Sequence, residues 1–90
     1  KMRDDFRCLL DELNPDALIL EPEYMDEAVI GIAVSGTPVL VYDTDKVVEL
    51  LMIHEGFNLQ DAIEWNEYNI IGSKGEHYPI HITTDWYRYA

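Results

Sequence analysis

Between residues 43 and 72, apolar positions recur at helical spacing in two consecutive runs. Asp43 is a residue type that caps helix N-termini, and Gly56 stands where a left-handed residue commonly ends a helix. Asn58 can cap a second helix, which Gly72 can end. The pattern therefore predicts two helices in tandem, joined by a very short turn.

The second of these helices has two unlike faces at 100° per residue. One face carries Leu59, Ala62, Ile63, Asn66, Asn69 and Ile70. The other carries Asp61, Glu64, Trp65, Glu67 and Tyr68. Two interpretations of this second face remain open. Its aromatic side chains are covered by another part of the chain, such as the aromatic segment 86–89, or they form a surface that binds a partner.

Two asparagines of the second helix, Asn66 and Asn69, are expected on its core side. A buried amide needs hydrogen-bond partners, so we expect them to bond the chain around Gly72 or an edge of the sheet. His54 lies near the end of the first helix, where an imidazole complements the helix dipole. We therefore expect a structural role for His54.

The rest of the chain predicts one more helix and a small sheet. Apolar spacing predicts an amphipathic helix over 2–13, which ends before Pro15. Strands are predicted at 17–20, 28–34, 39–42 and 77–83, with the middle two forming a hairpin. Gly31 inside the hairpin predicts a β-bulge or a close approach of another segment to the backbone. We expect a single α+β domain over residues 1–90: a small antiparallel sheet with an N-terminal helix and a two-helix pair packed on one face.

Charge limits the classes of partner. The chain has 18 acidic and 6 basic side chains, a formal net charge of −12. Such a protein repels nucleic acid and anionic membranes and attracts basic protein surfaces. Two capped helices also suggest a helix-turn-helix, but the second carries no Lys or Arg for phosphates or base edges. We therefore expect a protein partner and no direct binding of nucleic acid.

No metal or cofactor site is expected. Cys8 is the single cysteine, which excludes an internal disulfide and a cysteine zinc site. The acidic segment 21–27 lacks the glycine turn and ligand alternation of a calcium loop. His77 and His81 would lie about 13 Å apart along an extended strand, too far to share one ion. No nucleophile, base and orienting group can be placed together, so no catalytic residue is expected.

Signals for membrane insertion or export are also missing from the sequence. No apolar run approaches the roughly 20 residues of a membrane span, and no basic segment precedes an apolar one as in a signal peptide. We therefore expect a cytoplasmic protein.

The C-terminal half carries a pattern of residues that resembles a group of short, largely uncharacterised acidic proteins encoded by bacteriophages and bacterial genomes. The matching positions are Gly56, Ala62, Glu64, Trp65, Tyr68, Asn69, Gly72, Gly75, Glu76 and Pro79. The chain departs from the pattern at Asn66, where an aromatic is expected, and at Ser73 and Lys74. The resemblance implies no activity, but it favours a phage-type accessory protein that binds and inhibits a host factor.

Three functional hypotheses follow. The first is an acidic inhibitor or decoy that occupies a basic, nucleic-acid-binding or defence-related host protein through Asp61, Glu64, Trp65, Glu67 and Tyr68. The alternative is a structural module that self-associates as a homodimer through Trp65 and Tyr68. An enzyme using His54, His77 or His81 ranks last. A nucleic-acid mimic would also require carboxylates arrayed like phosphates.

Overall fold

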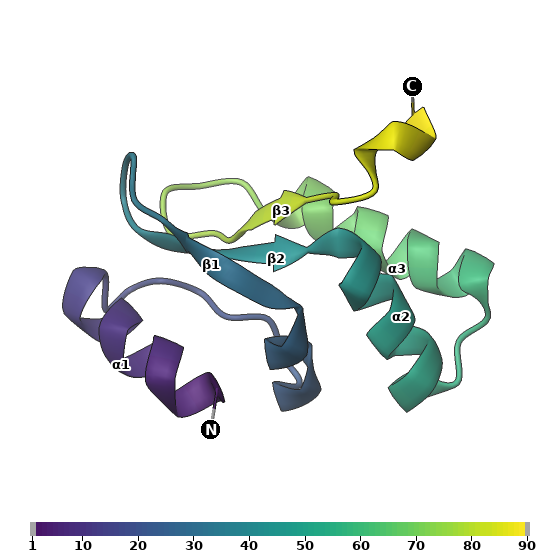
Figure 1. The fold of residues 1–90 in the computed structure, drawn as a ribbon, viewed down its shortest axis with the longest axis horizontal. Helices are drawn as coiled ribbons and strands as arrows, with labels where there is room; N and C mark the ends of the chain where they lie inside the picture. The colour runs from purple at the N-terminus through teal and green to yellow at the C-terminus, as the bar shows by residue number, and fades with distance from the viewer. Residues whose placement is uncertain (1, 90) are drawn as a thin grey trace.

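The chain folds into helices packed against a short three-stranded sheet (Figure 1). The structure is a computed structural model that describes residues 2–89, with side chains described for residues 6–87. In chain order the elements are α1 (Met2–Leu13), the 3₁₀ helix η1 (Glu23–Ala28), β1 (Val29–Ala33), β2 (Val39–Asp43), α2 (Thr44–Glu55), α3 (Leu59–Gly72), β3 (Ile80–Ile82) and the 3₁₀ helix η2 (Trp86–Tyr89). The α+β class predicted from the sequence is confirmed.

The sheet has the order β1-β2-β3, with β2 in the centre. β1 and β2 form the predicted antiparallel hairpin, in which Ala33 pairs with Val39. β3 runs parallel to β2, with Ile80 opposite Val41, so the prediction of a wholly antiparallel sheet is wrong for this strand. The reason is the connection. α2 leads away from the end of β2 and α3 leads back, so the chain re-enters the sheet in the direction of β2.

Two further predictions concern the hairpin and the segment before it. The register of β1 against β2 shifts between Val29 and Gly31, which confirms the predicted bulge. Residues 17–20, predicted as a strand, are irregular. They make isolated bonds instead of a ladder: the Leu18 N–H donates to the carbonyl of His77 at 2.9 Å, and the Leu20 N–H donates to the hydroxyl of Tyr42 at 2.9 Å.

One hydrophobic core joins the helices to the central strand. Its buried members are Leu10, Met25, Ala28, Leu40, Tyr42, Val47, Leu50, Leu51 and Ala62. Leu40 and Tyr42 are two residues apart on β2 and so share one face of the sheet. The same cluster includes Leu10 of α1, three apolar side chains of α2 and Ala62 of α3. The predicted packing of the helices on one face is therefore confirmed.

The 3₁₀ helix η1 is fastened to the C-terminal end of α2. The ring of Tyr24 stacks on His54 with a centroid separation of 4.2 Å and an angle of 11°. The Tyr24 hydroxyl also donates to Oε2 of Glu55 at 2.5 Å. Burial, together with this carboxylate, raises the pKa of Tyr24 to about 12. His54 therefore takes part in a structural contact, in addition to its position in the last turn of α2.

Candidate functional site

The turn between α2 and α3 fixes which side of α3 faces outward. Gly56 ends α2 with a left-handed φ of 70°, and two residues later Asn58 caps α3 by accepting the N–H of Asp61 at 2.8 Å. With the turn set, Ala62 and Asn66 are buried. Because helical side chains repeat every 3.6 residues, the side of α3 opposite these two is turned toward solvent.

The structure brings together four of the five side chains predicted to bind a partner. A shallow hollow of about 450 Å³ is lined by Phe57, Asp61, Glu64, Trp65, Tyr68 and Asn69. Trp65 is half-buried and packs against the core, whereas Tyr68 is 84% exposed. We call this feature the Trp65 hollow. It offers a rigidly placed indole and a free phenol to an approaching molecule.

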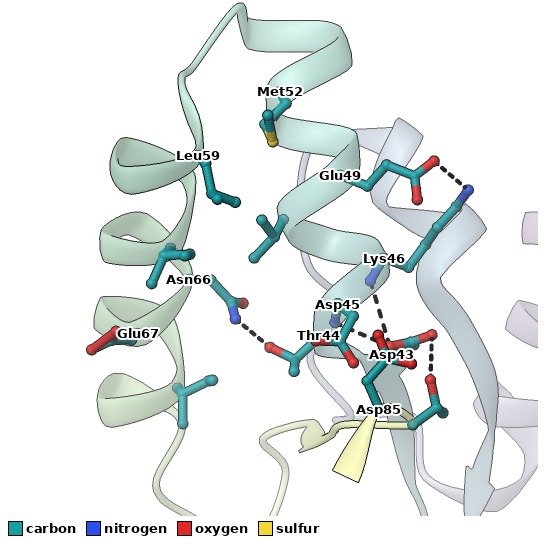
Figure 2. A pocket seen from close by; sticks show the side chains of 14 residues that line it. Asp43, Thr44, Asp45, Lys46, Glu49, Met52, Leu59, Asn66, Glu67 and Asp85 are labelled. Carbon is teal, nitrogen blue, oxygen red and sulfur yellow. Dashed lines mark hydrogen bonds and ion pairs between the residues drawn. The ribbon is translucent and has the colours of Figure 1, made fainter. Parts of the chain in front are cut away.

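Glu67, the fifth predicted residue, does not line the Trp65 hollow. It lies on another flank of α3, beside a groove between α2 and α3 (Figure 2). The grouping of Glu67 with the other four residues is therefore not found in the structure.

The two C-terminal aromatic side chains that the structure describes, Trp86 and Tyr87, do not cover the Trp65 hollow. Trp86 is 68% exposed and Tyr87 is 63% exposed, and neither lines the hollow. Their rings lie edge to face against each other, with centroids 6.3 Å apart. The side chain of Tyr89 lies outside the described residues. The interpretation that the chain covers these aromatic side chains is therefore wrong for Tyr68 and holds in part for Trp65, which is half-buried against the core.

The hollow is negatively charged. Asp61 and Glu64 are exposed at its margin, and α3 contains no Lys or Arg. The side-chain amide of Gln60 donates to Oε1 of Glu64 at 3.1 Å, which orients that carboxylate without neutralising it. An indole flanked by two carboxylates attracts a ligand that combines a cation with an apolar surface.

The three histidines lie in three different settings. His54 stacks on Tyr24. His77 contacts the Asn14 amide through Nδ1 at 3.1 Å, and its Nε2 lies 3.7 Å from Oε2 of Glu76. Among the side chains that the structure describes, those of residues 6–87, no three His, Cys, Asp or Glu residues are grouped so that they could hold a metal ion.

His81 forms a pair with Ser73 that no pattern in the sequence indicates. Nε2 of His81 lies 3.0 Å from the Ser73 hydroxyl, which also donates to the carbonyl of Asn69 at 2.9 Å. Because the hydroxyl proton is engaged by that carbonyl, Nε2 is the donor toward Ser73. This is the reverse of the direction in which a histidine activates a serine. Burial lowers the pKa of His81, so the pair is a neutral hydrogen bond that joins the end of α3 to β3.

No model of a known protein family, no curated protein and no solved structure matches the chain. Among the described residues, none of the helices is both long and apolar enough to cross a membrane.

Proposed function

We propose that this protein binds a basic protein of a host cell through the Trp65 hollow and so acts as an inhibitor or decoy. The observation that carries the proposal is the exposure of Tyr68, at 84%, beside a half-buried Trp65 and two exposed carboxylates. Tyr and Trp are the residues that most often supply binding energy at protein interfaces. The resemblance to phage-encoded proteins supports a host protein as the target.

The charge of the surrounding surface supports a basic partner. Residues 43–72 contain seven acidic side chains and one lysine. Such a surface raises the rate of association with a positively charged protein and disfavours phosphate backbones. The proposed partner therefore presents Lys or Arg around an apolar side chain that rests on Trp65. A nucleic-acid-binding protein of the cytoplasm has a surface of this kind.

The proposal is tested by immobilising the protein and passing a bacterial lysate over it at low salt. A partner held by charge should be retained and then released at about 0.5 M salt, where the Debye length is only a few ångströms. The double variant Asp61→Asn/Glu64→Gln should lose this partner, and Tyr68→Ala should weaken its retention. Mass spectrometry identifies the retained protein.

The matched control is Glu12→Gln/Glu27→Gln, because both glutamates are exposed and lie on α1 and η1, away from the hollow. It removes the same two charges. Equal losses in the two double variants would show that only net charge matters and would refute the assignment of the site. A concentration-dependent dimer that is abolished by Tyr68→Ala would support the self-association alternative instead.

A further inference from the structure

A second feature, on another flank of α3, carries an inference of its own. A groove of about 630 Å³ separates α2 from α3 (Figure 2). Its apolar lining consists of Val48 and Met52 from α2 and Leu59, Ile63 and Ile70 from α3. Met52 is 40% exposed and Leu59 is 56% exposed. The two helices therefore present a strip of apolar side chains that remains open to solvent.

The rim of the groove is acidic. Its carboxylates are Asp43, Asp45, Glu49, Glu67 and Asp85. The only base among the lining residues is Lys46, whose Nζ lies 3.3 Å from Oε1 of Glu49. The carboxylates that border the apolar strip thus come from the end of β2, from both helices and from the segment after β3. This arrangement complements a ligand with an apolar stripe between basic flanks.

The lining also contains a buried polar atom without a partner. Asn66 is only 5% exposed and points from α3 toward α2, where its Nδ2 donates to the Thr44 hydroxyl (Figure 2). Its carbonyl oxygen Oδ1 is buried and accepts no hydrogen bond. Buried amide oxygens are almost always bonded. A donor supplied at this point of the lining would complete the hydrogen bonding of the Asn66 amide.

We propose that the α2–α3 groove docks an amphipathic helix of a partner protein, with its apolar stripe along Met52 and Leu59 and its basic side chains over the rim. Helices of the length of α2 and α3 span about 20 Å, which matches three to four turns of a guest helix. Lys and Arg suit the flanks because their stems cover apolar surface while their charged ends reach carboxylates. This inference stands apart from the Trp65 hollow and does not depend on it.

The probe for this proposal is a fluorescein-labelled helical peptide with a stripe of leucines flanked by lysines, titrated with the protein in a fluorescence anisotropy assay. The variant Met52→Lys/Leu59→Lys places two cations inside the groove. It should weaken binding by at least about tenfold, equivalent to the loss of one good apolar contact. Two further peptides, with serine in place of leucine or glutamate in place of lysine, should bind at least about tenfold more weakly than the probe.

The matched control is Ile53→Lys/Ile71→Lys. These isoleucines lie on the same two helices, are 64% and 66% exposed, and do not line the groove. The control makes the same change in net charge and should alter binding by less than about twofold. Circular dichroism verifies that both double variants are folded. Equal weakening in the two variants, or equal binding of the serine peptide, would overturn the proposal.

Nuclear magnetic resonance locates the peptide and separates this proposal from that for the Trp65 hollow. In ¹H–¹⁵N spectra, saturation with the peptide should shift the side-chain amide of Asn66 and the backbone amides of Val48 and Ile63. The indole N–H of Trp65 should not shift. If the indole shifts and the Asn66 amide does not, the peptide occupies the Trp65 hollow, and the groove proposal is wrong whatever the outcome of the lysate experiment.

Discussion

Protonation of the His81 side chain is linked to the stability of the fold. It is half-buried, lies beside Tyr42 with ring centroids 6.2 Å apart, and donates to Ser73. Burial lowers the pKa of His81 below its ordinary value. The folded state therefore favours the neutral imidazole, and protonation favours the unfolded chain.

The sign of the resulting pH dependence follows from this shift. An unfolded histidine has a pKa of about 6.5, so the contribution of His81 to stability is fully present above that pH and is lost as the pH falls below it. We expect His81→Gln to flatten the pH dependence of the free energy of unfolding between about pH 7.5 and 5.5. Urea unfolding of both proteins across this range provides the measurement. Parallel curves for the two proteins would contradict it.

Helical periodicity gives the angles between side chains around one helix, but not which of them face a neighbouring helix. Asp61, Glu64, Trp65 and Tyr68 lie within one arc of α3 and share the Trp65 hollow as predicted. Glu67 is about 60° around the helix from Glu64, at the edge of that arc, at 100° per residue. Which flank such a borderline residue joins depends on where α2 packs against α3, and the sequence of one helix does not contain this information.

Asn66, on the buried side of α3, shows the same limit of prediction from the sequence of one helix. Its position on the core side was predicted correctly, and it is 5% exposed. Its predicted partners, near Gly72 or the edge of the sheet, are wrong, because its amide bonds Thr44 in the first turn of α2. The pairing spans 22 residues and exists only because two helices pack side by side. Local sequence patterns cannot reveal it.

At the scale of elements, the boundaries of α2 and α3 could be predicted because capping is local chemistry. Oδ1 of Asp43 accepts the N–H of Asp45 at 3.0 Å and that of Lys46 at 3.4 Å. Asn58 caps α3 in the same way. Each cap satisfies backbone donors that no helical carbonyl can reach.

Gly56 gives a prediction at this scale, because its φ of 70° is unfavourable for any residue with a Cβ atom. A methyl group added there would meet no atom within 4 Å, so any loss of stability comes from the backbone alone. We expect Gly56→Ala to lower the free energy of unfolding by about 1 kcal/mol, measured by urea unfolding.

The matched control is Gly36→Ala in the hairpin turn. A methyl group there also meets nothing within 4 Å, and the φ of Gly36 is not positive. This variant should be neutral or slightly stabilising, because alanine restricts the unfolded chain. Equal losses in both variants would show that the left-handed conformation is not the cause.

The direction of β3 and the state of residues 17–20 could not be predicted locally. The alternation of side chains in a strand is the same whether its neighbour runs parallel or antiparallel. For β3 the direction is set by the α2–α3 crossover. A short apolar run such as 17–20 is equally compatible with a strand and with an irregular segment that packs on a core.

For the whole molecule, the net charge of −12 works against folding. Like charges repel one another more strongly in the compact state, and salt screens that repulsion. We expect the thermal midpoint of unfolding to rise by about 5 °C when sodium chloride is raised to roughly 0.5 M, equivalent to a gain of about 1 kcal/mol. Circular dichroism at two salt concentrations measures it.

A charge variant serves as the control for this effect. Glu12→Lys/Glu27→Lys changes two exposed residues and takes the net charge from −12 to −8. Its midpoint should depend less on salt than that of the unchanged protein. An equal or larger salt dependence in the variant would mean that repulsion between the acidic side chains is not the cause.

The bulge between Val29 and Gly31 affects how the protein behaves when it is concentrated. β1 lies at one edge of the sheet, and its extra residue, Ile30, is 50% exposed. A straight apolar edge offers regularly spaced N–H and C=O groups to other chains, which is how amyloid fibrils grow. The bulge interrupts that spacing and bends the strand. β1 is consequently a poor template for fibril formation.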